Sequence, residues 1–166
     1  DAYWDHILPE RLNTSVASSP YFKLYLMAQV HSGDKGFLSN QITVDALISN
    51  RGDIHHLFPK KYLQRNGHNS RSEYNQIANY AITQSEINYQ IKDDAPNIYM
   101  TKILEQIESK KSVIGGILTK EQLNESFKQN CIPEEFVNYD VNTYYEFLAR
   151  RRYLMSQKIR DYYFSL

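Results

Sequence analysis

Hydrophobic residues recur at helical spacing over most of the chain, on both sides of a short central stretch where the pattern breaks. In residues 20–30, Tyr21, Leu24, Tyr25 and Ala28 occupy positions i, i+3, i+4 and i+7, the spacing of one face of an amphipathic helix. A proline opens this stretch, as suits a first helical turn, and a glycine-containing turn follows it. The pattern therefore predicts a helix over residues 20–30.

Shorter helical signals lie on either side of that helix. Thr43 is placed to cap a short helix that carries Ala46 and Leu47. Near the start of the chain, Trp4 and Leu8 lie four positions apart, as if the sequence began inside an element. We therefore expect the chain to be part of a longer protein, with a further region on its N-terminal side.

The C-terminal part of the sequence also reads as helical. Asp94 is placed to cap a helix with Pro96 in its first turn, Thr119 and Gln122 have the spacing of a capping box, and Pro133 opens another start. The final stretch carries apolar residues at spacings close to whole turns: Tyr144, Leu148, Met155, Ile159, Tyr162 and Leu166. Helices are thus predicted over most of residues 95–166.

The central stretch has a different character. Residues 53–58 are short and partly apolar and stop at Pro59, which suits a strand at an edge. Residues 79–84 form a second strand candidate, and Ser85 followed by Asn88 suits a helix start. We expect one mainly α domain over residues 1–166, in which a strand–turn–strand–helix insertion at 51–94 separates a helical lead-in (1–50) from a helical C-terminal part (95–166).

Composition narrows the class of protein. The chain has 166 residues, 42% of them hydrophobic, which is enough for the core of one domain. No apolar run approaches the roughly 20 residues that span a bilayer, so we expect no membrane-embedded segment. The one cysteine, Cys131, cannot close an intramolecular disulfide. A chain of this length without disulfides favours a reducing compartment, and we expect the cytoplasm.

The insertion holds the most chemically loaded residues of the chain. His55 and His56 end the first predicted strand just before Pro59, and Asn79 and Asn88 follow. Each residue also has a plain structural interpretation: a histidine pair with one core and one surface member, and asparagines in a turn and a cap. A structural zinc site is disfavoured, because such sites usually need several cysteine ligands.

The order of these residues resembles the HNH, or ββα-metal, endonuclease superfamily. In that superfamily one strand carries a metal ligand followed at once by the catalytic histidine, an asparagine precedes the second strand, and a helix offers the last metal ligand. The resemblance implies that His55 and Asn88 hold the metal, that His56 is the catalytic base, and that Asn79 is the middle asparagine. The expected fold is therefore mainly α with a small embedded ββα-metal motif.

More narrowly, the chain looks like the nuclease domains of GmrSD-type modification-dependent restriction enzymes. Six stretches carry this likeness: Asn13-Thr14-Ser15, residues 33–37, residues 55–60, residues 75–79, residues 93–96, and Arg150-Arg151-Arg152. The nine-residue step from Asn79 to Asn88 belongs to the likeness with the wider superfamily. The resemblance implies a DNA-cleaving domain of a restriction or defence system. It also implies a separate N-terminal region that binds nucleotide and helps to recognise modified DNA.

Physical chemistry supports the same roles. A neutral His56 can accept the proton of an attacking water, because the reference pKa of histidine lies near 6.5. One imidazole and one amide leave room for water and phosphate around a divalent cation, which suits Mg²⁺ or Mn²⁺. Asp53 lies two residues before His55, on the same face of a regular strand, and is a candidate partner or further ligand. The Asn79 amide is expected to bond the backbone on both sides and keep His56 in register.

The charges are balanced overall but unevenly distributed. Nineteen basic residues face nineteen acidic ones, which by itself argues weakly against a nucleic-acid partner. Residues 51–71, however, hold five basic side chains against one acidic, and residues 148–160 hold five against none. The candidate phosphate-binding residues of these two segments are Lys60, Lys61, Arg65 and Arg71, followed by Arg152 and Arg160 in the last helix. For the last helix, a solvated face opposite an apolar stripe is the competing interpretation.

Three functional hypotheses follow from the sequence. The first is a divalent-metal-dependent HNH endonuclease acting on DNA. The second is a non-catalytic helical module that binds nucleic acid or protein, and the third is the same chemistry directed at RNA. One site of this kind cuts one strand at a time, so a homodimer is one arrangement that would allow double-strand cutting.

Overall fold

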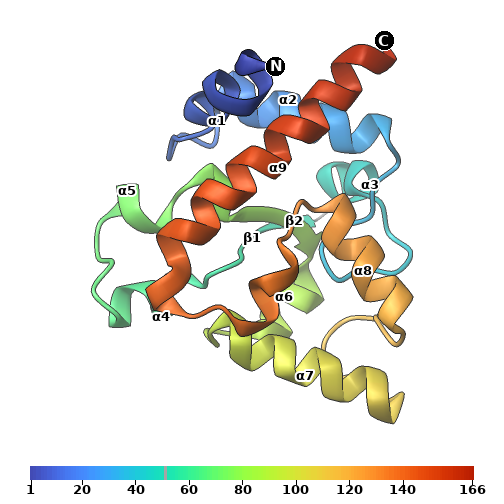
Figure 1. Cartoon of the computed structure of the whole chain (residues 1–166). Coiled ribbons are helices and arrows are strands. Elements are labelled where there is room, and N and C mark those ends of the chain that lie inside the picture. The colour runs from blue at the N-terminus through green and yellow to red at the C-terminus, as the bar shows by residue number, and fades with distance from the viewer. Residues whose placement is uncertain (51) are drawn as a thin grey trace.

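The computed structural model describes residues 1–50 and 52–166, and it is mainly helical with one small antiparallel sheet (Figure 1). The helices are α1 (Leu8–Arg11), α2 (Pro20–His31), α3 (Val44–Ser49), α4 (Lys60–Arg65), α5 (Arg71–Tyr74), α6 (Ser85–Ile91), α7 (Pro96–Ser109), α8 (Lys120–Gln129) and α9 (Tyr144–Ser165). The strands are β1 (Gly52–His56) and β2 (Tyr80–Gln84). A π-helical turn (Tyr3–Ile7) precedes α1, and 3-10 turns cover Ile77–Asn79, Glu134–Asn138 and Val141–Thr143.

Local capping explains where several helices begin. The Thr43 hydroxyl accepts a hydrogen bond from the backbone N–H of Ala46 at 3.2 Å, and Thr119 and Gln122 form the predicted capping box of α8. The helices predicted over residues 20–30, after Thr43, after Thr119 and at the end of the chain are all present, as α2, α3, α8 and α9. The prediction that Asp94 caps α7 is wrong. Pro96 is the first helical residue, so Ala95 takes the capping position, and the Asp94 carboxylate pairs with Lys102 at 2.8 Å.

The two strands pair antiparallel, with His55 opposite Ala81 and His56 opposite Tyr80. Helix α6 follows β2 without a loop, as predicted. The predicted turn between the strands instead contains the short helices α4 and α5 and a 3-10 turn. Strand β1 ends at His56, two residues before its predicted end. The backbone N–H of Leu57 still bonds to the carbonyl oxygen of Asn79, but the N–H of Phe58 bonds to the Asn79 side chain instead of to a partner strand. Asn79 belongs to a 3-10 turn, so β2 begins one residue later than predicted.

An aromatic core lies beneath β1. The Phe136 ring contacts Phe58, Tyr99 and Phe147 with centroid distances of 6.1, 6.0 and 5.4 Å. Phe37 joins the same group and stacks on the His55 ring at 5.7 Å. His55 therefore rests directly on the apolar core, and this contact fixes its ring.

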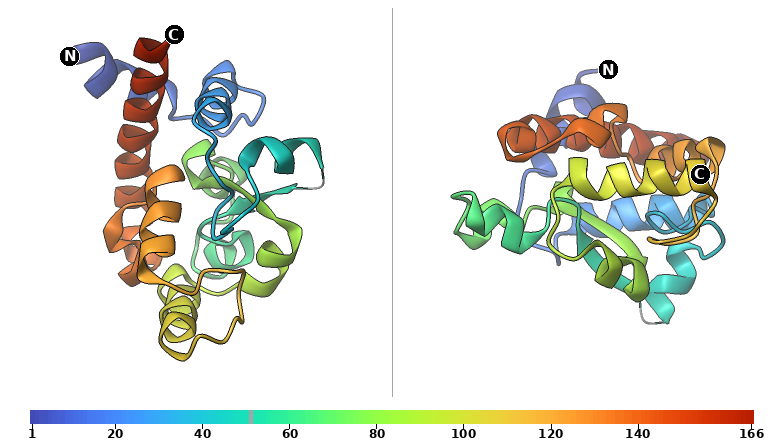
Figure 2. Two further views of the ribbon diagram at one scale, coloured as in Figure 1. Left: turned by 90° about the vertical axis from the view of Figure 1, so that its right-hand side faces the viewer. Right: turned by 90° about the horizontal axis from the view of Figure 1, so that it is seen from below.

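Helix α9 crosses the molecule diagonally, and the two chain ends lie at the same end of the structure (Figures 1 and 2). The Trp4 and Tyr163 rings meet there at 5.6 Å. Ser156 lies four positions from both Arg152 and Arg160 and therefore shares their face of α9. It is fully buried, and its hydroxyl donates to the carbonyl oxygen of Trp4. The interpretation of this face as solvated is thus wrong at its centre, because the N-terminal turn covers it. In the described ranges no helix is long and apolar enough to cross a bilayer.

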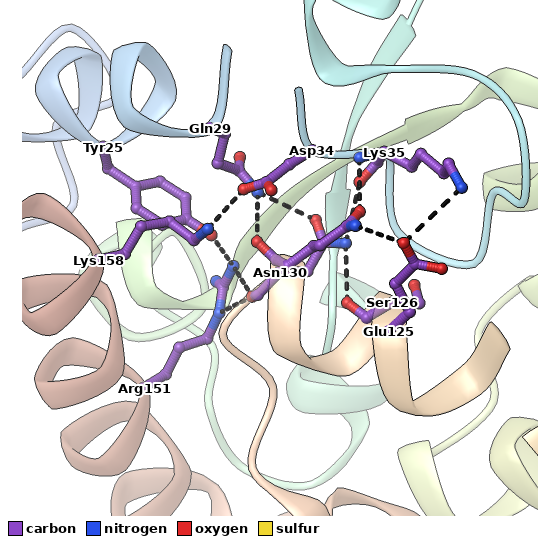
Figure 3. A network of polar contacts seen from close by, with 10 residues as sticks. Tyr25, Gln29, Asp34, Lys35, Glu125, Ser126, Asn130, Arg151 and Lys158 are labelled. Carbon is purple, nitrogen blue, oxygen red and sulfur yellow. Dashed lines mark hydrogen bonds and ion pairs between the residues drawn. The ribbon is translucent and has the colours of Figure 1, made fainter. Parts of the chain in front are cut away.

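A buried arginine of α9 ties distant segments together (Figure 3). The Arg151 guanidinium donates to the carbonyl oxygens of Ala78 at 2.9 Å, Tyr80 at 2.5 Å and Asn130 at 3.1 Å. Its Nη2 also reaches the Tyr25 hydroxyl at 3.5 Å. These bonds hold the beginning of β2 and the end of α8 against α9, so α9 sets the position of the strand pair.

Candidate functional site

Three of the predicted residues form one hydrogen-bonded chain across β1 and α6. The Asn88 Nδ2 donates to Asp53 Oδ2 at 3.2 Å, which turns the Asn88 oxygen toward His55. His55 Nδ1 lies 2.7 Å from that oxygen. Asp53 Oδ1 in turn accepts a hydrogen bond from the Ser85 hydroxyl at 3.1 Å. The sheet register and the direct β2–α6 junction bring these side chains together.

His55 is neutral in this environment. It is 2% exposed, and burial lowers its pKa to about 4, although the hydrogen bond with Asn88 opposes the shift. An amide oxygen can only accept, so Nδ1 carries the ring hydrogen and Nε2 keeps a lone pair. Among the described residues Nε2 has no hydrogen-bond partner. The lone pair of the buried His55 Nε2 therefore accepts no hydrogen bond from the described residues.

His56 points to a different partner. Its Nε2 lies 2.8 Å from Asn75 Oδ1, at the end of α5, and its ring meets Tyr80 edge-on at 5.2 Å. Because the Asn75 oxygen can only accept, Nε2 carries the hydrogen and Nδ1 is free to take up a proton. Burial lowers the pKa of His56, the hydrogen bond with Asn75 raises it, and the nearby Lys60 lowers it. The net direction favours the neutral, proton-accepting form near pH 7.

Asn79 supports the site through the backbone. Its Oδ1 accepts the backbone N–H of Phe58 at 2.8 Å, and its Nδ2 donates to the carbonyl oxygens of Phe58 at 3.0 Å and Tyr74 at 3.3 Å. The side chain is fully buried. Asn79 therefore closes the turn after His56 from both sides and joins it to the segment that carries Asn75.

A small polar cavity of about 120 Å³ lies where these elements meet. Its lining consists of Ile54, His55, His56, Pro59, Lys60, Asn88, Lys92 and Asp93. The cavity thus brings together residues of β1, Asn88 of α6 and two lysines. This arrangement suits a small anionic group held beside a proton acceptor.

The predicted basic residues differ in their contacts, and of them only Lys60 lines this cavity among the described residues. Lys60 lines it, with its ammonium 5.1 Å from the centre of the Tyr74 ring. Arg65 donates to the carbonyl oxygen of Asp93 at 3.1 Å, while Lys61 and Arg71 are exposed on α4 and α5. In α9, Arg152 donates to Gln76 Oε1 at 3.1 Å and Arg160 pairs with Asp161 at 3.4 Å. Arg51 lies outside the described residues.

The donor set fits a divalent cation. Two ligand atoms about 2.1 Å from an ion and at right angles lie about 3 Å apart, close to the 2.7 Å between His55 Nδ1 and Asn88 Oδ1. A cation between these two atoms would take the place of the Nδ1 hydrogen, and the neutral ring would then carry its hydrogen on Nε2. Asp53 adds a carboxylate next to Asn88. The described chain contains no group of three or more His, Cys, Asp or Glu side chains that could hold a metal. Binding would therefore depend on the mixed set of imidazole, amide and carboxylate.

Two residues of the site were missed from the sequence. Asn75 has no spacing that relates it to His56, since the two meet only through folding. Lys92 follows Asn88 by four positions, but it lies one residue after α6 with a positive φ of 60°, so helical spacing does not place its side chain. Neither residue had a spacing that marked it as part of the site.

No protein-family model, curated protein or solved structure matches this chain.

Proposed function

We propose that this chain is a divalent-metal-dependent endonuclease domain of the HNH class that hydrolyses DNA phosphodiester bonds. One observation carries the proposal: the β1–β2–α6 unit places His55 Nδ1 2.7 Å from Asn88 Oδ1, beside a cavity that His56 also lines. The residues His55, His56, Asn79 and Asn88 are also those that carry the family resemblance of the sequence. The embedded motif within the mainly helical fold is part of this proposal.

Each residue has a role in this reading. His55 and Asn88, supported by Asp53, would hold the cation, which when bound supplies charge stabilisation for the phosphate and the leaving oxygen. His56 accepts the proton of the attacking water at Nδ1, because Asn75 keeps the hydrogen on Nε2. Asn79 holds the turn that aims His56 into the cavity.

The positive side chains near the cavity define how substrate would lie. Lys60 lines the cavity, and Lys61, Arg65 and Arg71 follow on α4 and α5. Phosphates on both sides of the cut bond would meet this surface. Modified DNA as the substrate, a restriction or defence role, a nucleotide-binding N-terminal region, a homodimer and a cytoplasmic location belong to the same proposal and rest on the sequence alone.

The first experiment is a plasmid-nicking assay with Mg²⁺ or Mn²⁺, repeated in excess chelator. We expect metal-dependent nicking that falls about 10³-fold in His56→Ala, since a positioned general base contributes roughly 10²–10⁴-fold. His31→Ala is the matched control, because His31 is exposed and far along the chain from the cavity. Undiminished nicking by His56→Ala would contradict the assignment, and cleavage of RNA but not DNA would change the substrate.

A second experiment measures metal binding without catalysis. Mn²⁺ should raise the melting temperature of the parent and of His56→Ala, but not of His55→Ala or Asn88→Ala, because ligand binding to the folded state stabilises it. A non-catalytic binding module predicts no such response in any variant.

A further inference from the structure

We propose that Lys92 is a phosphate-binding residue of this site, presented by a backbone conformation that a lysine adopts only at a cost. The inference rests on the nuclease function proposed above and extends it to a residue for which the sequence reading assigned no role.

The backbone at Lys92 is unusual. The residue follows the last turn of α6 with φ 60° and ψ −131°, a region that glycine occupies freely and that strains residues with a Cβ atom. Lys110 at the end of α7 also has a positive φ of 59°, but its ψ of 25° lies in the ordinary left-handed basin. Lys92 therefore holds the more costly conformation of the two lysines.

The strained turn delivers Lys92 to the cavity. Lys92 lines the cavity together with His55, His56 and Lys60. Arg65 donates to the carbonyl oxygen of Asp93 and so fastens this turn to α4, the helix that begins with Lys60. The two lysines are thus held at the same cavity by a contact between their own elements.

The charges of the cavity favour an anion. The charged residues that line it are Lys60, Lys92 and Asp93, two basic and one acidic. The ion pairs among the described residues include neither Lys60 nor Lys92. The ammonium of Lys92 is therefore available to a phosphate oxygen. A cation at the end of a helix also interacts with the helix carbonyls, but that explanation predicts an effect on folding stability and none on binding.

The test compares two substitutions at one position. Lys92→Gly and Lys92→Ala both remove the ammonium, but only glycine relieves the backbone. Both are made in the His56→Ala protein, so that DNA stays intact, and duplex binding is measured by fluorescence anisotropy at several salt concentrations. We expect both to bind about tenfold more weakly at 0.1 M salt, with the slope of log K against log salt reduced by about 0.9. Lys92→Gly should melt about 2–4 °C above Lys92→Ala.

Lys110→Gly in the same background is the matched control, because it replaces a positive-φ lysine at another helix end. It should bind DNA as tightly as the His56→Ala protein. Unchanged affinity and salt slope in both Lys92 variants would overturn the phosphate role, and equal melting temperatures would overturn the strain. If the His56→Ala protein shows no salt-dependent DNA binding, this inference and the proposed function both fail. If the His56→Ala protein binds DNA and the Lys92 variants bind it equally well, only the inference about Lys92 fails.

Discussion

Two buried polar clusters lie on the same strand pair and are built in opposite ways. In the Arg151 cluster (Tyr25, Asn130 and Arg151, with the carbonyls of Ala78 and Tyr80), each guanidinium nitrogen has an acceptor in the protein. In the His55 cluster (Asp53, His55 and Asn88), the His55 ring is also buried, but its Nε2 has no partner among the described residues. His55 and Asn88 are also among the residues that line a cavity. One cluster is saturated and the other is open.

This difference suggests that the Arg151 cluster stabilises the fold and that the His55 cluster binds a ligand. A buried polar group normally finds a partner, because leaving it unbonded costs about 1–3 kcal/mol. In a saturated cluster every hydrogen-bonding group already bonds to another segment of the protein, so no group is available to a ligand. An open cluster beside a cavity keeps bonding capacity that a ligand can use. Substitutions in the two clusters should therefore act on different measured quantities.

The largest effect is expected from Arg151→Ala. It leaves three buried carbonyl oxygens without their donor, and we expect the free energy of unfolding to fall by about 4 kcal/mol. Urea denaturation measures this loss, and Arg150→Ala, an exposed neighbour on α9, should stay within about 0.5 kcal/mol of the parent. An Arg151→Ala protein as stable as Arg150→Ala would show that the cluster is not a support.

The next effect is a pH dependence that belongs to the open cluster. The pKa of His55 is about 4 in the fold and about 6.5 in an unfolded chain, so the unfolded state takes up the proton first as pH falls. The free energy of unfolding should therefore decrease between about pH 6.5 and pH 4, by up to about 3 kcal/mol, and should not depend on this group above pH 7. Urea denaturation of the metal-free protein across this range measures the slope. His55→Gln should flatten it, and an unchanged slope in that variant would assign the dependence to other groups.

A smaller effect is expected from Asn75→Leu, which removes the acceptor for His56 Nε2. Without it His56 loses its orientation and its preferred hydrogen position, and we expect cleavage to slow about 10- to 100-fold, by analogy with residues that orient catalytic groups. Asn75→Asp keeps the acceptor oxygen and should retain more activity than the leucine variant. The exposed Asn69 provides the control Asn69→Leu. Equal rates for Asn69→Leu and Asn75→Leu would leave Asn75 without a positioning role.

The smallest effect concerns the support beneath the open cluster. The buried Tyr99 hydroxyl donates to the carbonyl oxygen of Leu57 at 2.6 Å, next to the His55 ring. Tyr99→Phe should lower the free energy of unfolding by about 1 kcal/mol and leave the ring in place. Tyr89→Phe, at a position 81% exposed, should change nothing measurable. If Tyr99→Phe slows cleavage by more than the loss of folded protein explains, Tyr99 acts in the site itself and does not only support it.

Much of this architecture was predictable because its causes are local. Helical spacing predicted α2 and α9, and hydroxyl caps at Thr43 and Thr119 marked the starts of α3 and α8. The strand–strand–helix order was predictable from residue type and turn signals. The exact end of β1 was not, since it depends on Asn79 capturing the backbone of Phe58 across 21 positions of sequence.

The sequence by itself determined the order of the elements and nominated Asp53, His55, His56, Asn79 and Asn88, because those signals depend on neighbours within a few positions. Only the tertiary structure decided which of them meet, how deeply His55 is buried, and that Asn75 and Lys92 join them. It also turned Arg151 from one of three similar basic residues into the buried anchor of β2. The physical reason is that burial and partner choice are set by packing between segments far apart in the chain, and local spacing carries no record of that packing.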